Sequence, residues 1–229
     1  MKQYNSILKH ISEKQKCLAI LIDPDKFSVD KAGFFLKRIP KETTHIFVGG
    51  STVKNGHTEA AVKALKEYCR LPIILFPGDH SQITKEADAL LFLSLISGRN
   101  PEYLIGQQVK AVAKLKESRL EVIPAAYLLI EGGNESAVAR VTQTEPLSQK
   151  DLETIASTAK AGEYMGAKLI YLEAGSGASY PVSPNIIRKV KKMTNIPLVV
   201  GGGIRNTAQR TAAYEAGADM VVMGTIFEE

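Results

Sequence analysis

This sequence lacks tryptophan, a set of cysteines that could form a disulfide framework, and long apolar runs. Its 229 residues contain no tryptophan and only two cysteines, Cys17 and Cys69, each in an apolar or helical context. We expect reduced thiols in a cytoplasmic protein rather than a disulfide or a redox site. The charged N-terminus, MKQYNSILKHISEKQK, is unlike a secretory signal, and no apolar run is long enough to span a membrane.

The sequence also lacks a concentrated surface for nucleic acid. Its 29 basic and 24 acidic residues leave a net charge of +5, which suits an anionic ligand. The densest basic run, 188–192, has no interleaved aromatic side chains on which bases could stack. The four histidines show no metal-ligand spacing, and neither cysteine lies near a plausible base. Nucleic-acid binding, zinc chemistry and thiol catalysis are therefore disfavoured.

Eight short apolar runs recur along the chain. They are near-continuous rather than alternating, which predicts parallel strands covered on both faces. The runs are Leu18–Ile22, His45–Val48, Pro72–Phe76, Ala89–Leu93, Val122–Tyr127, Lys168–Leu172, Pro197–Val200 and Asp219–Met223.

Segments with helical spacing of apolar residues separate most of these runs. They include 56–70, 149–165 and 101–118, where Ile105, Val109 and Val112 form the predicted inner face. The alternation predicts one (β/α)8 TIM barrel over residues 1–229. An open doubly wound sheet would require a glycine-rich turn after the first strand, where the sequence reads DPDKFS.

Three departures from a regular barrel are expected. Only the 12 polar residues PGDHSQITKEAD separate Phe76 from Ala89, so the third helix is predicted to be absent or rudimentary. The resulting gap in the wall would admit an elongated ligand. The eighth helix is predicted to be missing or truncated, and an N-terminal helix around Tyr4 and Ile7 could cover part of its place. Residues 130–147 are expected to form a hairpin or flap over the mouth.

Glycines follow three strands at the rim where such barrels bind ligands. The clusters are Gly175-Ser176-Gly177, Gly201-Gly202-Gly203 and Gly224-Thr225. Any one of them is explained by a turn that needs positive φ. Three on one rim favour a phosphate cradle, because backbone N–H groups can converge on an anion there.

Acidic residues occupy two strand ends of the same rim. A buried carboxylate at Asp23 requires a cation, either a lysine or a metal, and Mg²⁺ with substrate phosphate fits that requirement. Asp25 could be a second ligand or a turn residue, and Lys26 could neutralise phosphate or pair with Asp25. Glu173 could accept a proton from a hydroxyl or hold a polyol.

Five motifs together resemble the geranylgeranylglyceryl phosphate synthase family, more narrowly its second group. They are LIDPDK at 21–26, VGGST at 48–52, YLEAGSGA at 171–178, VGGGIR at 200–205 and VMGT at 222–225. The resemblance covers nearly the whole chain. It implies a prenyltransferase that joins sn-glycerol 1-phosphate to a long prenyl diphosphate, geranylgeranyl diphosphate first of all, through an ether bond. Diphosphate is released with the help of Mg²⁺.

The resemblance also implies roles for individual residues. Asp23 and Ser51 would be the Mg²⁺ positions, and Asp23 and Glu173 the catalytic residues. A prenyl chain would lie in the groove left by the missing third helix, with Tyr103 a candidate for its floor. Glycerol phosphate would be held by Tyr171, Leu172, Glu173, Ala174, Gly175, Ser176, Gly177, Gly202, Gly203, Gly224 and Thr225.

The family further implies a homo-oligomer, either a dimer or a hexamer, without a nucleic-acid partner. With no membrane-spanning segment, peripheral contact with a membrane is expected at product release. Two alternatives stay open beside the prenyltransferase. One is a sugar-phosphate isomerase or epimerase, which needs the phosphate cradle but no apolar groove. The other is a non-catalytic phosphate-binding barrel, against which the acids at Asp23 and Glu173 argue.

Overall fold

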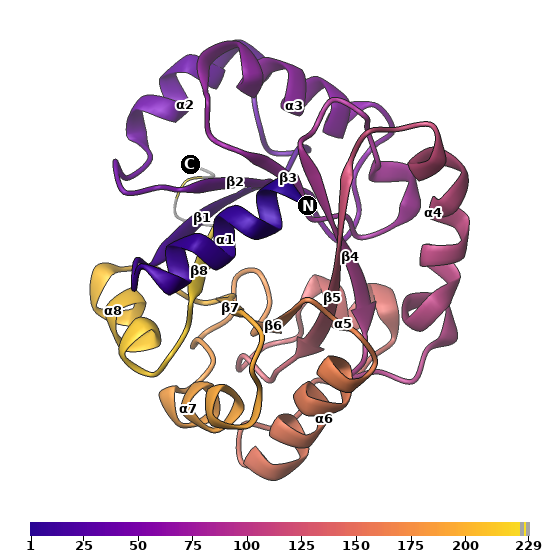
Figure 1. The fold of residues 1–229 in the computed structure, drawn as a ribbon. Coiled ribbons are helices and arrows are strands. Elements are labelled where there is room, and N and C mark those ends of the chain that lie inside the picture. The colour runs from indigo at the N-terminus through magenta and orange to yellow at the C-terminus, as the bar shows by residue number, and fades with distance from the viewer. Residues whose placement is uncertain (225–226, 228–229) are drawn as a thin grey trace.

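Residues 1–224 and 227 are described in this computed structural model, and they form a closed barrel of eight parallel strands (Figure 1). The strands pair in sequence order, and β1 pairs with β8 to close the sheet. All eight predicted strands are confirmed, each within two residues of the expected bounds. They are β1 (Cys17–Ile22), β2 (His45–Val48), β3 (Ile73–Leu75), β4 (Ala89–Leu95), β5 (Glu121–Leu129), β6 (Leu169–Glu173), β7 (Leu198–Gly201) and β8 (Met220–Met223).

Helices alternate with the strands and form an outer layer around most of the barrel (Figure 1). Asn206 caps the last of them by accepting from the backbone N–H of Gln209 at 2.9 Å, as a capping residue should. The helices are α1 (Lys2–Ser12), α2 (Ala32–Arg38), α3 (His57–Tyr68), α4 (Gln107–Lys116), α5 (Ala137–Thr142), α6 (Leu152–Tyr164), α7 (Pro184–Met193) and α8 (Thr207–Glu215), with single turns η1 (Val29–Lys31), η2 (His80–Gln82) and η3 (Glu102–Gly106).

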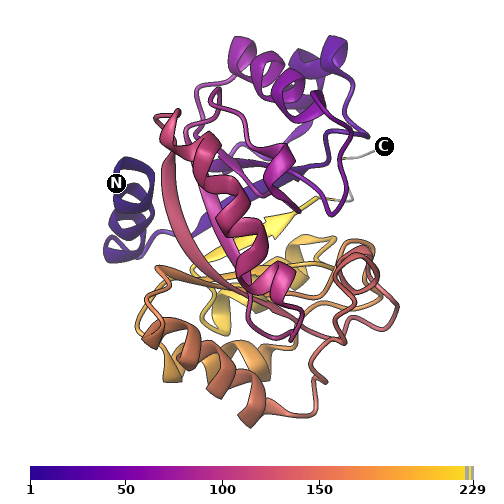
Figure 2. The same ribbon diagram turned by 90° about the vertical axis from the view of Figure 1, so that its right-hand side faces the viewer.

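Helix α1 lies across the end of the barrel where the strands begin (Figures 1 and 2). Its Tyr4 and Ile7 are buried against the barrel interior, and the Tyr4 hydroxyl donates to the carbonyl of Lys168 at 3.0 Å. The expectation that α1 covers part of the place of the eighth helix is therefore wrong, because α1 packs its apolar face against the end of the barrel interior instead. The prediction about a helix after the last strand lies outside the described residues.

The third helix is reduced to one turn. Between β3 and β4 the chain forms only η2, which Asp79 caps by accepting from the N–H of Ser81 at 2.7 Å. The segment has no apolar face with which a helix could cover the sheet. Strand β3 pairs with β4 at only two positions, whereas β4 pairs with β5 at seven. The predicted gap in the wall is confirmed.

Helix α4 presents to the barrel a different face from the one predicted. Ile105, in the preceding turn η3, and Val109 and Val112 of α4 were expected to face inward, but their exposed fractions are 59%, 64% and 46%. Gln108 and Ala111 are the buried residues of this helix. The difference arises because the inner face of α4 lines a cavity as well as the core, and small and polar side chains occupy it. The spacing of apolar residues predicted the helix correctly, but it predicted the wrong side of the helix to face the barrel.

The insertion 130–147 is helical rather than a hairpin. Ser136 caps α5 by accepting from the N–H of Ala139 at 3.1 Å, and an isolated bridge between Ile130 and Leu147 closes the base of the segment. Val138 on α5 lines both cavities described below. The segment therefore covers the mouth as expected, although its local structure differs.

Candidate active site

A cavity of about 240 Å³ lies at the C-terminal ends of β1, β2, β6, β7 and β8. We call it the polar cavity, because it is lined mainly by glycines and charged or hydroxyl side chains. Strand alternation places its key residues, since Tyr171 and Glu173 of β6 point into the barrel while Leu172 packs against the outer helices. The predicted residues in its lining are Asp23, Ser51, Tyr171, Glu173, Ser176, Gly177, Gly202, Gly203 and Gly224.

Glu173 is a buried carboxyl group at the wall of this cavity. Burial raises the pKa of Glu173 to about 7, against which the N–H of Gly175 stabilises the charged form by donating to Oε1 at 2.7 Å. The Tyr171 hydroxyl is close enough to lower the same pKa, yet it makes no hydrogen bond of good geometry within the described chain. A base poised near neutral pH and a buried hydroxyl without a partner both point to a hydroxyl-bearing ligand.

The turn after β7 approaches β6 so closely that it requires glycine. Gly202 has φ +79°, and a Cβ there would lie 2.5 Å from both Glu173 Oε1 and the Gly175 nitrogen. The backbone N–H groups of this turn and of the turn after β6 can therefore reach a ligand without side chains intervening. The α8 helix begins just beyond, at Thr207, so its N-terminal dipole adds to the positive potential. This arrangement suits a phosphate group.

Two cationic side chains stand at the rim of the polar cavity. The Arg205 guanidinium donates to the carbonyls of Gly177, at 3.2 Å, and Ala178, at 2.7 Å, and so joins the turns after β6 and β7. Lys26 Nζ lies 3.8 Å from Asp23 Oδ2 and lines the cavity. Both charges favour an anionic ligand.

Asp23 and Ser51 come together at the opposite wall of the cavity. Asp25 turns away: its carboxylate accepts from the N–H of Lys54 at 3.1 Å and pairs with His57 Nδ1 at 2.8 Å. It therefore holds the loop after β1 against the loop after β2, and Lys26 pairs with Asp23 rather than with Asp25. Asp25 does not line the polar cavity, and its role as a metal ligand or a turn residue stays a prediction.

The donor set can be compared with the needs of Mg²⁺. No group of three or more His, Cys, Asp or Glu side chains in residues 1–224 and 227 is placed to share a metal ion. One carboxylate and one hydroxyl, beside a site for phosphate, still fit Mg²⁺, which keeps several waters and binds through one or two protein oxygens plus substrate phosphates. The residues therefore fit a shared metal–substrate site rather than a metal cage.

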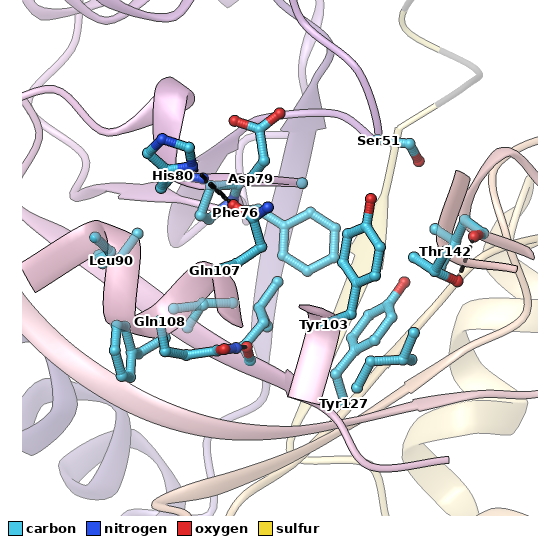
Figure 3. A pocket seen from close by; sticks show the side chains of 18 of the residues that line it. Ser51, Phe76, Asp79, His80, Leu90, Tyr103, Gln107, Gln108, Tyr127 and Thr142 are labelled. Carbon is cyan, nitrogen blue, oxygen red and sulfur yellow. Dashed lines mark hydrogen bonds between the residues drawn. The ribbon is translucent and has the colours of Figure 1, made fainter. Parts of the chain in front are cut away.

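A second cavity, which we call the apolar groove, occupies the gap left by the third helix. It runs between the η2 segment and α4, over β4 (Figure 3). Its walls include Phe76, Leu90, Phe92 and Leu93, with Tyr103 of η3 on the α4 side. An apolar channel of this kind suits a hydrocarbon chain.

The two cavities meet at a cluster of aromatic rings. The Phe76 ring lies 5.0 Å from that of Tyr171 and 5.9 Å from that of Tyr127, centre to centre. Ser51, Phe76 and Tyr127 line both cavities. A ligand in the groove and a ligand in the polar cavity would therefore touch at this cluster.

Not every predicted site residue lines a cavity. Leu172 and Ala174 pack in the outer core, and Gly175 acts through its bond to Glu173. Thr225 lies outside the described residues. Sequence reasoning did not assign Phe76, Tyr127 or Arg205 to the site. Each stands near the C-terminal end of a strand or, for Arg205, two residues after the glycines that follow β7, so the rule that barrel ligands bind at strand ends could have found them.

Comparison with known proteins agrees with this geometry. The PcrB family model matches residues 9–229. The geranylgeranylglyceryl phosphate synthase of Zunongwangia profunda is 55% identical over 99% of this chain and 97% of its own, and that of Thermococcus kodakarensis is 44% identical over 95% and 86%.

Solved structures give the same relationship. The crystal structure of (S)-3-O-geranylgeranylglyceryl phosphate synthase from Thermoplasma acidophilum, in complex with its substrate sn-glycerol-1-phosphate, superposes with a TM-score of 0.90 at 36% identity. It covers 99% of this chain and 91% of that one. Family model, curated relatives and solved structures thus agree with the site, and the chain belongs to the PcrB family of geranylgeranylglyceryl phosphate synthases.

Proposed function

We propose that this protein joins the 3-hydroxyl of sn-glycerol 1-phosphate to C1 of a long-chain prenyl diphosphate, geranylgeranyl diphosphate first of all. The observation that carries the proposal is the meeting of the polar cavity and the apolar groove at Ser51, Phe76 and Tyr127. One cavity suits a phosphorylated alcohol and the other a hydrocarbon chain. Their junction is where an ether bond between the two ligands would form.

Glu173 is the general base of the proposed reaction. The glycerol phosphate is held by backbone N–H groups of the turns after β6 and β7, with Arg205 at the rim. Its 3-hydroxyl then lies between the Glu173 carboxylate and the Tyr171 hydroxyl. As the hydroxyl oxygen bonds to C1, its proton passes to Glu173, whose pKa of about 7 suits that transfer.

The prenyl diphosphate loses its diphosphate in the same step. The C1–O bond breaks with its electron pair going to the diphosphate oxygen, while the glycerol oxygen forms the new C1–O bond. Asp23 and Ser51 would hold Mg²⁺ together with the diphosphate. An ion held there would supply positive charge that stabilises the leaving group. Lys26 adds a second positive charge on the same side.

The deciding experiment is incubation of the protein with sn-glycerol 1-phosphate and geranylgeranyl diphosphate, with mass analysis of the product. We expect a geranylgeranylglyceryl phosphate ether and free diphosphate. Absence of this product with every prenyl diphosphate offered would refute the proposal. A sugar-phosphate isomerase would use the polar cavity alone, and the apolar groove argues against it.

We also infer a homo-oligomer of the dimer or hexamer type. The exposed apolar side chains of Ile105 on η3 and of Val109 and Val112 on α4 support the inference, because neighbouring apolar side chains on a surface commonly mark an interface. Light scattering after size-exclusion chromatography measures the mass directly. A monomer at micromolar concentration would contradict the inference.

Location in the cytoplasm is proposed on the chemistry of the thiols. Cys17 and Cys69 are both free in the structure. No helix in the described part of the chain is long and apolar enough to cross a membrane. Contact with the membrane is therefore proposed as peripheral, when the lipid product leaves, and vesicle co-sedimentation with and without product tests it.

A further inference from the structure

A glutamine in the short segment between β3 and β4 is buried, although it lines neither cavity. Gln82 is the last residue of η2 and has an exposed fraction of 4%. Both ends of its amide bond to the same backbone residue. Its Nε2 donates to the carbonyl of Gly50 at 2.8 Å, and its Oε1 accepts from the N–H of Gly50 at 3.4 Å. Gln82 is therefore attached to the loop after β2, at the residue that directly precedes Ser51.

These two bonds lie where the pairing of β2 with β3 stops. The last bond of that ladder runs from the N–H of Phe76 to the carbonyl of Val48 at 2.9 Å. A parallel ladder uses every second residue, so its next bonds would join Gly50 to Phe76 and to Gly78. The Gln82 amide takes both positions on Gly50 instead. One side chain thus does for Gly50 what a further peptide group of β3 would do.

The loop held in this way is packed closely on two sides. A Cβ at Gly78 would lie 2.4 Å from the carbonyl oxygen of Gly50 and 2.6 Å from that of Ser51. On the other side, a Cβ at Gly50 would lie 3.3 Å from Asp23 Oδ1. Closely packed groups transmit a displacement to their neighbours. A change in the direction of the Gly50 peptide group would therefore move Ser51 relative to Asp23.

The position of Ser51 matters because it lines both cavities. In the proposed reaction Ser51 and Asp23 hold the diphosphate together with Mg²⁺, an ion that requires its oxygen ligands in near-ideal geometry. Without the Gln82 amide, the N–H and the carbonyl of Gly50 lose the partners that fix their direction. The loop would then carry Ser51 away from the place where the diphosphate binds.

We propose that Gln82 is a positioning residue for the diphosphate: its amide fixes the Gly50 peptide group and thereby places Ser51 beside Asp23. The inference rests on the proposed function and adds to it a residue that touches neither substrate. Loss of the amide weakens binding of the diphosphate. It leaves binding of glycerol phosphate unchanged, because the turns after β6 and β7 hold that ligand.

The test is calorimetric titration of wild type, Gln82→Met and Gln82→Glu with magnesium pyrophosphate. Methionine makes neither bond to Gly50, whereas an ionised glutamate accepts from its N–H but cannot donate to its carbonyl. We expect the dissociation constant to rise roughly tenfold or more in Gln82→Met and to rise in Gln82→Glu as well. The KM for glycerol phosphate should stay within about twofold of wild type in both.

Gln149→Met is the matched control. The Gln149 amide also bonds to backbone at both ends, since Oε1 accepts from the N–H of Ser183 at 2.8 Å and Nε2 donates to the carbonyl of Glu131 at 2.7 Å. These bonds join the segments after β5 and β6, on the glycerol phosphate side. Melting temperatures show how much each substitution destabilises the fold. Only the Gln82 variants should bind pyrophosphate more weakly.

A double-mutant comparison asks whether Gln82 acts through Ser51. Ser51→Ala removes the hydroxyl that the loop presents, so Gln82→Met should weaken pyrophosphate binding much less in that background than in wild type. A merely structural glutamine would have the same effect in both backgrounds. An equal factor in the two backgrounds would therefore refute the positioning role.

The binding measurements also separate failure of this inference from failure of the proposed function. If wild type forms no ether product but folded Gln82 variants lose pyrophosphate affinity as expected, the activity is misassigned and the role of Gln82 stands. If the folded variants bind pyrophosphate as wild type does, or if wild type does not bind it, Gln82 does not position a diphosphate site. Should Gln82→Met fail to fold, the isosteric Gln82→Glu decides the question.

Discussion

The polar cavity and the apolar groove share one rim of the barrel, yet they are built in different ways. The polar cavity is built by what the strand ends carry, with glycine turns, two acids and two cations converging on one volume. The groove exists because the outer layer lacks one helix, which leaves β4 uncovered between η2 and α4. Recognition of an anion needs backbone placed closely, whereas recognition of a hydrocarbon needs only apolar space. Changes in the two regions should therefore have separable effects.

The largest effect is expected from Glu173→Gln in the polar cavity. The amide keeps the size of the side chain and cannot accept the glycerol proton, so kcat should fall by roughly 10²–10⁴-fold. The KM for prenyl diphosphate should stay near the wild-type value. Steady-state kinetics with each substrate varied measures both quantities, with Glu131→Gln as an exposed-carboxylate control. If the variant kept full turnover, Glu173 would not be the general base.

Gly202→Ala should weaken glycerol phosphate binding and leave the groove intact. The new methyl group would meet Glu173 Oε1 and the Gly175 nitrogen at 2.5 Å, in a left-handed backbone conformation. We expect the KM for glycerol phosphate to rise roughly tenfold or more, because the strain and the clash each act at the anion site. Gly166→Ala is the matched control, since it has φ +96° and no atom within 4 Å of its Cβ. Equal effects of the two variants on KM would argue against a special role for Gly202.

The pH dependence of activity should also distinguish the polar cavity from the apolar groove. Because burial raises the pKa of Glu173 to about 7, the base is increasingly protonated below that pH. We expect kcat/KM for glycerol phosphate to fall about tenfold for each unit below pH 7, while the affinity for a prenyl thiolodiphosphate changes little. A profile that stays level from neutral pH to about pH 5 would show that Glu173 is not the group that titrates.

Tyr103→Ala should affect the groove alone. Its ring lines the groove from η3, and its hydroxyl lies 3.4 Å from the carbonyl of Val141 in α5. Removing the ring lengthens the apolar space, so we expect a shift of roughly fivefold in kcat/KM towards longer prenyl diphosphates. The KM for glycerol phosphate should not change. Tyr164→Ala, at an exposed position on α6, controls for the loss of a tyrosine.

His45 tests a region remote from both cavities, at the start of β2 beneath α1. Burial lowers the pKa of His45 to about 4, with a smaller effect from His10. The unfolded chain therefore binds this proton more readily, and stability is lost as pH falls from about 6.5 towards 4, by about 3 kcal/mol. Urea unfolding of wild type and His45→Gln at several pH values should show this loss in wild type only. If the free energies of unfolding of the two proteins changed with pH in the same way, the titrating group would not be His45.

The polar cavity was more predictable from the sequence than the groove, for a physical reason. Strand ends, acids and glycines follow from local patterns, so Asp23, Glu173 and Gly202 could be assigned to one rim from the sequence alone. The aromatic junction depends on which strand ends face one another across the barrel, and Phe76 and Tyr127 were not assigned. The burial of Gln108 has no local sign in the sequence, because helical spacing favoured the face of α4 that carries Val109 and Val112 as the inner one. Tertiary packing reversed that choice.

The missing third helix has a kinetic consequence. Because only the single turn η2 lies outside the barrel between β3 and β4, we expect a ligand of the groove to arrive from the side and a ligand of the polar cavity to arrive along the barrel axis. Neither ligand has to pass through the site of the other. Separate routes would leave both orders of substrate binding open, so initial-rate patterns of a random sequential type are expected rather than those of a compulsory order.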